Sequence, residues 1–397
     1  MATNTSSEDV INPLSDTEYL GIGIYLIFLG ISSVCCNGFV IFVLLKGEVK
    51  HNVMHNILLL NMAITDFLIS VVAYPLSASS SIQGRWIFSE ETCTFYGFWV
   101  FTLAMANMNT LAVIAICRYI VAVKQEYNYL LVKKNAKYFL LVIWIYSILW
   151  TGPPLLGWSS YTFEAYGTSC TINWAGRSIL DKTYNVTITF TCYISHVIIC
   201  CYSYFHVIKR YTWASNSDFG VALRSTDVNR QEPEETFNLE TVVSYHKVTT
   251  SRKVTMMCIT MLSSYILAWT PYTLLSLWVM FIGDVQPWLH VFPTLMAKSS
   301  TLSNAIVYGI LSSKFRESIK RMFNRKRPQV VPTHATIHRS PAEPMATSSR
   351  VHPTATQARE RIKKEQITYK TYSVHLIRND VYIGKNKVTL PNEEQIL

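Results

Sequence analysis

The sequence predicts an all-α protein: a bundle of seven transmembrane helices followed by a short amphipathic helix on the membrane surface. Half of the 397 residues are apolar and only 15% are charged, which is low for a soluble globular protein. Apolar stretches of roughly 20 residues, the length that crosses a bilayer, recur along the chain. We expect spans at residues 21–45, 53–80, 94–117, 138–160, 183–207, 254–283 and 285–313.

Lysine and arginine in the short loops predict the orientation, because cytoplasmic loops are enriched in them. The loops after the first and third spans carry six lysines, whereas the loops on the opposite side carry three basic residues. We therefore expect a multi-pass protein of the cell membrane. Its N-terminus is extracellular and its C-terminus is cytoplasmic.

Polar segments flank the predicted helical domain at 21–323. The extracellular tail, 1–20, contains Asn4-Thr5-Ser6, which fits a glycosylation acceptor. At helical spacing, residues 312–323 place Phe315, Ile319, Met322 and Phe323 on one face and their basic side chains mostly elsewhere, as in an amphipathic helix lying on the inner leaflet. The cytoplasmic tail, 324–397, is rich in Pro, Ser and Thr, and we expect it to be disordered.

The net charge of +10 does not indicate nucleic-acid binding. The tail alone holds 13 basic and 6 acidic residues, so most of the excess lies outside the helical domain. Such a tail is attracted to the anionic inner leaflet. The lipid bilayer is therefore the expected partner of this charge.

Lys298 and Asp66 are the only formal charges deep inside the predicted spans. An ammonium near the middle of a bilayer costs several kcal/mol, so such a residue is a functional hypothesis whose partner has to be found. Asp66 and Asn37 are isolated polar groups in apolar helices and need partners across the bundle. Taken alone, each of these two is a structural hydrogen-bonding residue.

Nine cysteines divide by their depth in the membrane. Seven lie in apolar spans, where they are most simply small packing residues. Cys93 and Cys170 both face the oxidising side and form the expected pair. Their bond would draw the loop at 157–182 over the mouth of the bundle as a lid.

Three further patterns are ambiguous in isolation. Arg118 at the cytoplasmic end of the third span fits a snorkelling arginine. Trp269 lies two residues before Pro271, where a kink would give the ring leverage, although aromatic residues at helical spacing usually belong to a core. The seventh span ends in Asn304-Ala-Ile-Val-Tyr308.

Taken together and in this order, the patterns resemble the rhodopsin-like G-protein-coupled receptors over about residues 20–325. The residues that carry the resemblance are Asn37, Asp66, Arg118-Tyr119, Trp144, Trp269-x-Pro271, Asn304 to Tyr308, and the Cys93–Cys170 pair. Within that family, the stretch "AKSSTLSN" with Lys298 six residues before Asn304 is similar to the animal opsins, and the loops are most similar to the peropsin and neuropsin groups.

This resemblance implies that Lys298 forms a Schiff base with retinal. Because the protonated Schiff base needs a counterion and the third span has Tyr96 where the vertebrate visual opsins have a glutamate, the candidate is Glu164 in the lid. The alternatives are that Glu164 is a solvated loop acid, or that Asp66 is the acid concerned. Asp66 lies nearer the cytoplasmic half, however, and we expect it to share a polar network with Asn37 and Asn304. Trp269 and Tyr272 would line the chromophore pocket, with Tyr96 near the Schiff base.

The resemblance also implies a light-driven receptor that binds and activates a heterotrimeric G protein at its cytoplasmic face. Isomerised retinal would no longer fit against Trp269, and the sixth span would swing about its proline. An acid in the lid implies a bistable pigment, and tail hydroxyls could serve a kinase and arrestin. The switch residues implied are Arg118, Tyr119, Tyr202, Pro271, Asn304 and Tyr308.

Four positions depart from the family pattern. Cys117 replaces the acid before Arg118, and Ser251 replaces the acid at the start of the sixth span, so the off state lacks its usual latch. Ala305 and Ile194 replace prolines of the seventh and fifth spans. A retinal photoisomerase or retinoid-binding opsin with little signalling therefore stays open as the rival function. A receptor for a diffusible amine or peptide would leave Lys298 unexplained, and neither a metal site nor any other enzyme is expected.

Overall fold

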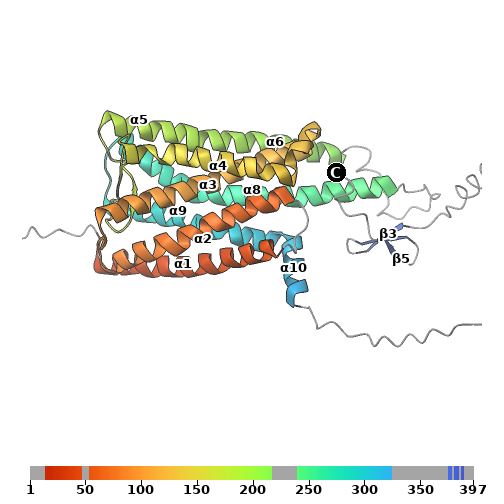
Figure 1. The fold of residues 1–397 in the computed structure, drawn as a ribbon, viewed down its shortest axis with the longest axis horizontal. Helices are drawn as coiled ribbons and strands as arrows, with labels where there is room; N and C mark the ends of the chain where they lie inside the picture. The colour runs from red at the N-terminus through yellow and green to blue at the C-terminus, as the bar shows by residue number, and fades with distance from the viewer. Residues whose placement is uncertain are drawn as a thin grey trace, which may run out of the picture. The chain divides into compact units, whose positions relative to one another are not determined.

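The computed structural model describes residues 14–46, 53–216 and 239–323, together with three short segments at 374–377, 380–383 and 386–388 (Figure 1). The predicted acceptor Asn4 lies outside the described residues. So does most of the tail that was expected to be disordered and to carry kinase and arrestin sites.

Seven membrane helices lie side by side in the bundle (Figure 1), which confirms the predicted fold class. The fifth span is continuous but changes its winding, passing from α5 through a π-helical turn, η4, into α6. The helices are α1 (Asp16–Leu45), α2 (Val53–Ile82), α3 (Glu90–Ala122), α4 (Ala136–Thr151), α5 (Ile179–Ile188), η4 (Thr189–Ile194), α6 (Ser195–Asn216), α8 (Leu239–Phe281) and α9 (Pro287–Leu311).

Six of these spans are long and apolar enough, within the described residues, to be recognised as membrane-crossing by composition alone. The seventh, α9, is less apolar because it carries Lys298 and a run of hydroxyl and amide side chains. Polar residues on a buried span usually face the bundle interior. The weakest membrane signal thus marks the helix on which the candidate site depends.

Local sequence explains where the helices begin and end. Ser15 caps α1 in a reciprocal capping box with Glu18, and Ser89 caps α3. The expected span at 138–160 was too long, because α4 ends at Thr151 and a short 3₁₀ turn, η3 (Pro153–Leu156), follows. The two consecutive prolines cannot continue the helix, since each lacks an N–H donor. On the cytoplasmic side, η1 (Gln125–Leu131) and η2 (Lys133–Asn135) connect α3 to α4.

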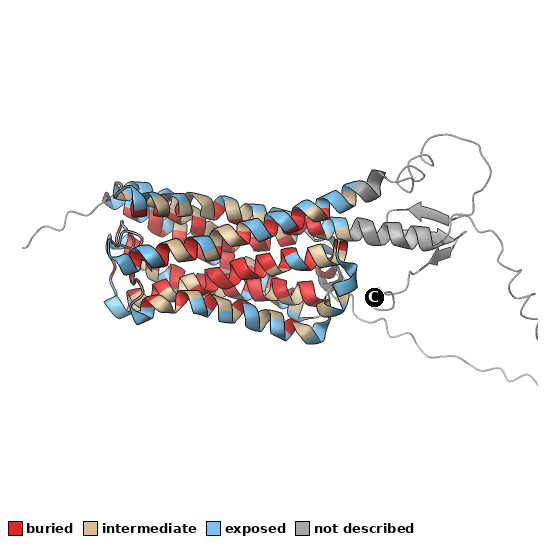
Figure 2. Ribbon diagram, turned by 90° about the horizontal axis from the view of Figure 1, so that it is seen from above, coloured by how far each residue is buried: buried red, intermediate tan, exposed pale blue. Residues whose placement is uncertain are grey.

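Burial places α3 at the centre of the bundle (Figure 2). In its most apolar window 78% of the residues are buried, against 22% for the fourth span, which lies at the periphery. Exposed large apolar side chains such as Phe28 and Ile31 lie on the outer faces of the helices. In a membrane these side chains contact lipid and require no protein partner.

A β-hairpin forms the predicted lid between the fourth and fifth spans. Its strands β1 (Tyr161–Phe163) and β2 (Cys170–Ile172) are antiparallel. The predicted disulfide between Cys93 and Cys170 is confirmed, with the two Cα atoms 5.5 Å apart, and it attaches the hairpin to α3. Gly97 permits this approach, because a Cβ there would lie 2.7 Å from the ring of Tyr161.

A short helix, α10 (Ser313–Phe323), follows α9 at the position expected for the amphipathic helix. Its Phe315 is buried and packs on the ring of Tyr308, with the ring centroids 4.8 Å apart, and on Phe39 of α1. The apolar face of α10 is thereby joined to the ends of two membrane helices.

A separate small unit contains three strands that composition did not reveal. They are β3 (Val374–Ile377), β4 (Asp380–Ile383) and β5 (Asn386–Val388), paired antiparallel in the order β3-β4-β5. The prediction of a disordered tail is not tested for the residues around them.

Candidate functional site

The amine of Lys298 lies inside the bundle and donates a hydrogen bond to the hydroxyl of Tyr96 on α3, at 3.0 Å. Tyr96 is almost wholly buried, with 1% of its surface exposed. Among ion pairs between described residues, none involves Lys298. The amine is therefore held by a neutral partner rather than by a carboxylate.

A cavity with about 740 Å³ of empty space surrounds this amine. Its wall combines aliphatic, aromatic and polar side chains, and the aromatic ones include Phe101, Trp174, Trp269 and Tyr272. These four residues also border a second cavity of about 540 Å³, whose far wall is formed by the fifth span. The two cavities adjoin through these shared residues, and Lys298 lines the first of them.

Glu164 reaches this space from the lid. Only 8% of its surface is exposed, and its Oε1 accepts a hydrogen bond from the Tyr272 hydroxyl at 3.1 Å. Burial raises the pKa of the Glu164 carboxyl to about 7, although the charge of Lys298 and the Tyr272 hydrogen bond both act to lower that pKa. The interpretation of Glu164 as a solvated loop acid is therefore wrong.

Tyr272 joins the lid to α8. Its hydroxyl accepts a hydrogen bond from the indole N–H of Trp174 at 3.1 Å and lies 2.8 Å from the hydroxyl oxygen of Thr171. Trp174 and Thr171 were not expected in the site. Both stand in a loop whose sequence carries no periodic signal, so only the fold shows that they face Tyr272.

Trp269 packs at the base of the cavity, as expected. Its indole N–H donates to the hydroxyl of Ser300 on α9 at 3.1 Å, and its ring stacks on Tyr265 with the centroids 5.7 Å apart. Pro271 lies two residues further along within α8. The ring therefore connects the helix with the proline to the helix with the lysine.

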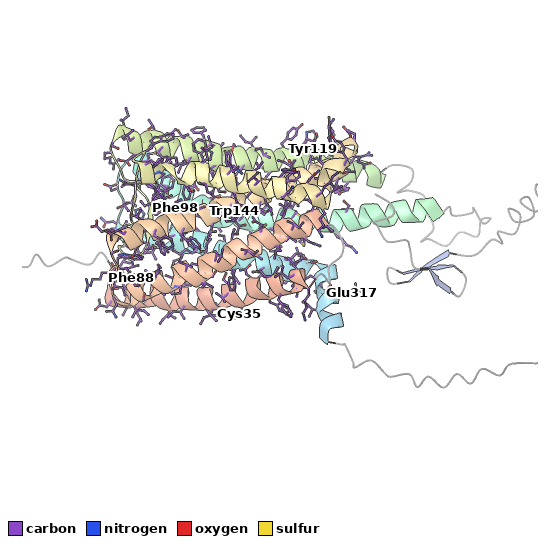
Figure 3. All side chains as sticks on the ribbon, viewed as in Figure 1. Cys35, Phe88, Phe98, Tyr119, Trp144 and Glu317 are labelled. Carbon is purple, nitrogen blue, oxygen red and sulfur yellow. A yellow bond between two sulfur atoms is a disulfide. The ribbon has the colours of Figure 1, made fainter. Side chains whose placement is uncertain are left out.

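The two buried polar residues predicted to share a network are not in direct contact. The Asp66 carboxylate accepts hydrogen bonds from Asn304 at 3.2 Å and from Asn107 at 2.5 Å. Asn37 instead donates to the backbone carbonyl of Thr301 at 2.9 Å. Asn107 was missed because an asparagine on α3 has no distinguishing neighbour in the sequence. Trp144 (Figure 3) donates to Asn61, so its role is interhelical packing.

The cytoplasmic end holds the remaining predicted switch residues. Arg118 is 6% exposed, its Nε has no hydrogen-bond partner, and the neighbouring Cys117 is buried. Tyr119 (Figure 3) contacts Tyr202, with ring centroids 5.9 Å apart. These residues lie at the opposite end of the helices from Glu164 and are not brought into the cavity.

A hydroxyl contact joins the fifth and sixth spans at this end. The hydroxyl oxygen of Tyr211 on α6 lies 2.7 Å from that of Ser251 on α8. Ser251 is the position at which the resemblance led us to look for an acid. A neutral contact to the fifth span therefore occupies that place.

A bundle of seven membrane helices with a disulfide-anchored lid over a buried cavity defines a seven-transmembrane receptor. The model of the 7 transmembrane receptor (rhodopsin family) matches residues 36–308. The chain therefore belongs to the rhodopsin family of seven-transmembrane receptors, which are receptors and not enzymes.

Relatives of this chain among known proteins include opsins. The chain is 27% identical over 306 residues to "Rhodopsin, G0-coupled" of Mizuhopecten yessoensis, covering 77% of this chain and 73% of that protein. It is 27% identical to the human "Visual pigment-like receptor peropsin", covering 85% and 94%, and 28% identical to human "Opsin-5", covering 74% and 78%. The crystal structure of squid rhodopsin matches its fold with a TM-score of 0.67, at 24% identity over 78% of this chain and 86% of that one.

We predict that the empty protein becomes less stable as the pH rises. The folded state binds the Glu164 proton more tightly than the unfolded chain, where the pKa is 4.5, so this stabilisation is present below pH 4.5 and is lost as the pH passes about 7. The effect amounts to roughly 3 kcal/mol at most. Glu164→Gln should abolish the dependence in thermal unfolding of the detergent-solubilised protein, whereas Glu126→Gln, at an exposed cytoplasmic acid, should retain it. An unchanged slope in the Glu164 variant would contradict the assignment.

Proposed function

We propose that the protein is a retinal-binding photoreceptor that activates a heterotrimeric G protein, as a bistable pigment. One observation carries the proposal: a lysine side chain lines a buried cavity that also holds aromatic rings and, from the lid, the buried carboxyl group of Glu164. A receptor for a diffusible amine would have no use for a cation there.

The residues present fit a retinoid. The cavity wall offers aromatic rings to an apolar polyene. The hydroxyl of Thr294, which also lines the cavity, is buried without a hydrogen-bond partner. Retinal, when bound, would supply a light-driven double-bond isomerisation and a protonated Schiff base at Lys298.

Glu164 is the proposed counterion. It lines the same cavity as Lys298, and no cationic side chain among the described residues pairs with it. A positive charge held at the lysine nitrogen would favour the ionised form of the carboxyl, and the carboxylate would in turn favour the charge. Tyr96 would keep the nitrogen end of the lysine oriented by its hydrogen bond.

Trp269 and Pro271 are the proposed output of the cavity. A change of ligand shape against Trp269 acts on α8 directly, because the ring belongs to that helix. The ligand shifts the equilibrium only by its differential contact with the two positions of the helix. The signalling step is supported by the switch residues that the family pattern requires and by the helix α10. These residues are Arg118, Tyr119, Tyr202, Asn304 and Tyr308.

A retinal photoisomerase is the second candidate. Cys117 and Ser251 favour it, because neither can form the ionic latch of the family at Arg118. Light-dependent nucleotide exchange on a panel of purified G proteins separates the two. Exchange that follows illumination supports signalling, whereas isomer turnover without exchange supports the isomerase.

Lys298→Ala should abolish the visible absorption band that the native protein gains with retinal. The amine is the only described lysine that lines the cavity, so no other nitrogen replaces it. Purified protein is reconstituted with retinal isomers and its spectrum is recorded. Lys182→Ala, at an exposed lysine in the first turn of α5, should keep the band. A band that survives in the Lys298 variant would rule out the attachment site.

Glu164→Gln should move the absorption from the visible to the ultraviolet near neutral pH. Without the carboxylate, the positive charge at Lys298 loses its anion and is given up at a lower pH. A pH titration of the visible band measures the midpoint in both proteins. An unchanged midpoint would place the counterion elsewhere.

Cys117→Asp should lower the nucleotide exchange seen in the dark. A carboxylate beside Arg118 would pair with a guanidinium whose Nε has no partner and so stabilise the resting state. One charge-assisted hydrogen bond is worth roughly 1.5–3 kcal/mol, so gaining one predicts a reduction of roughly 10-fold to 150-fold. Cys117→Asn gives the uncharged control, and an increase in dark exchange in the Asp variant would refute the latch.

A further inference from the structure

The backbone of Lys298, and not only its amine, has a buried tyrosine partner. Tyr74 on α2 is 2% exposed, and its hydroxyl donates to the Lys298 carbonyl oxygen at 2.7 Å. The same hydroxyl lies 2.8 Å from the Thr301 hydroxyl oxygen, which itself donates to the Lys298 carbonyl at 3.0 Å. Two hydroxyl groups from different helices thus meet at one carbonyl group.

This contact is not needed to form α9. A carbonyl inside an α-helix already accepts a hydrogen bond from the backbone N–H four residues later. A phenol in a membrane interior, however, needs a hydrogen-bond partner for its hydroxyl. The Tyr74 hydroxyl finds that partner on the turn of α9 that carries Lys298. The extra bonds therefore fix the position of that turn relative to α2.

The packing around Tyr74 leaves its ring little freedom. A Cβ at Gly30 of α1 would lie 3.3 Å from the ring, so the glycine lets the ring pass close to α1. From the same helix, Asn37 and Ser33 donate to the carbonyl oxygen of Thr301 at 2.9 and 3.2 Å. One turn of α9 is thus attached to both α1 and α2.

We propose that Tyr74 is a positioning residue that fixes the backbone of Lys298, which is the root of its side chain, while Tyr96 holds the amine nitrogen. The inference rests on the proposed function, because it assigns Tyr74 a part in presenting the amine to an aldehyde. With the root fixed, a change of ligand shape is not absorbed by movement of the lysine backbone. It is directed instead toward Trp269 and α8.

Tyr74→Phe tests this assignment, because it removes one oxygen atom and keeps the ring. Tyr184→Phe is the matched control: Tyr184 is wholly buried, its hydroxyl donates to the Trp150 carbonyl at 2.6 Å, and it borders neither cavity. In the empty protein, hydrogen exchange of the α9 amides around Lys298 should be roughly five-fold faster in the Tyr74 variant, the factor expected for one lost hydrogen bond. The control should not change exchange in α9.

The second readout uses the pigment. Bleaching by hydroxylamine in the dark should be roughly five-fold faster in Tyr74→Phe than in the native protein and unchanged in Tyr184→Phe. Native rates in both assays, with the variant folded, would overturn the proposal. Equal acceleration in the two variants would also overturn it, because the effect would then be general loss of stability.

Thr301→Val gives an independent check if Tyr74→Phe folds poorly. It removes the second hydroxyl from the same carbonyl and keeps the shape of the side chain. Because the two hydroxyls act together, the double variant should be less impaired than the sum of the singles, whereas additive effects would contradict the arrangement. If the native protein gains no colour with retinal, the proposed function fails, and hydrogen exchange still decides whether Tyr74 fixes the turn.

Discussion

The structure depends on the burial of one amine among apolar helices. Lys298 Nζ has the hydroxyl of Tyr96 as its hydrogen-bond partner, and that hydroxyl cannot neutralise a charge. In a medium of low dielectric constant, any positive charge formed at this nitrogen needs an anion that is also removed from water. The lid brings Glu164, the proposed counterion, into the cavity, and the Cys93–Cys170 bond attaches the lid to the central helix. The disulfide is therefore part of the electrostatics of the site as well as of its stability.

The same lid connects the carboxyl group to the helix expected to move. Tyr272 belongs to α8 and bonds Glu164, Thr171 and Trp174. A displacement of α8 breaks or stretches these hydrogen bonds, so it changes how well the carboxylate is stabilised. By linkage, the charge on Glu164 must then bias the position of α8 to the same extent. The charge on Glu164 and the position of α8 are thus coupled through the hydroxyl of Tyr272.

The helices were predictable because bilayer thickness sets their length and each span reads as one apolar stretch. The exceptions have local causes, as at α4, where two prolines end the helix before the expected boundary. The fifth span, expected as one apolar stretch at 183–207, contains a π-helical turn at η4. In that turn the Thr191 carbonyl accepts hydrogen bonds from the hydroxyls of Tyr146 and Ser195, at 3.0 and 2.5 Å. Side chains therefore satisfy this carbonyl, and the turn contains no proline.

Lys298 could be singled out from the sequence because a charge in a long apolar stretch is rare. Glu164, Trp174, Asn107 and Tyr74 stand in stretches with no pattern that distinguishes them from other residues of the same type. Their partners lie far away in the chain, and Tyr74 is 224 positions from Lys298. The resemblance to opsins pointed to Glu164, but only the folded lid shows that the carboxyl is buried.

The cytoplasmic end carries a weaker restraint than the cavity. Between described residues no ion pair holds Arg118, and the sixth span is joined to the fifth by the neutral contact between Tyr211 and Ser251. A neutral hydrogen bond contributes about 1 kcal/mol, less than a charge-assisted one. Since the lid and Trp269 attach α8 at its other end through several hydrogen bonds, the resting position of the helix is governed mainly from the cavity. A receptor built in this way responds chiefly to what occupies the cavity, and its two candidate functions differ in how firmly the cytoplasmic end follows.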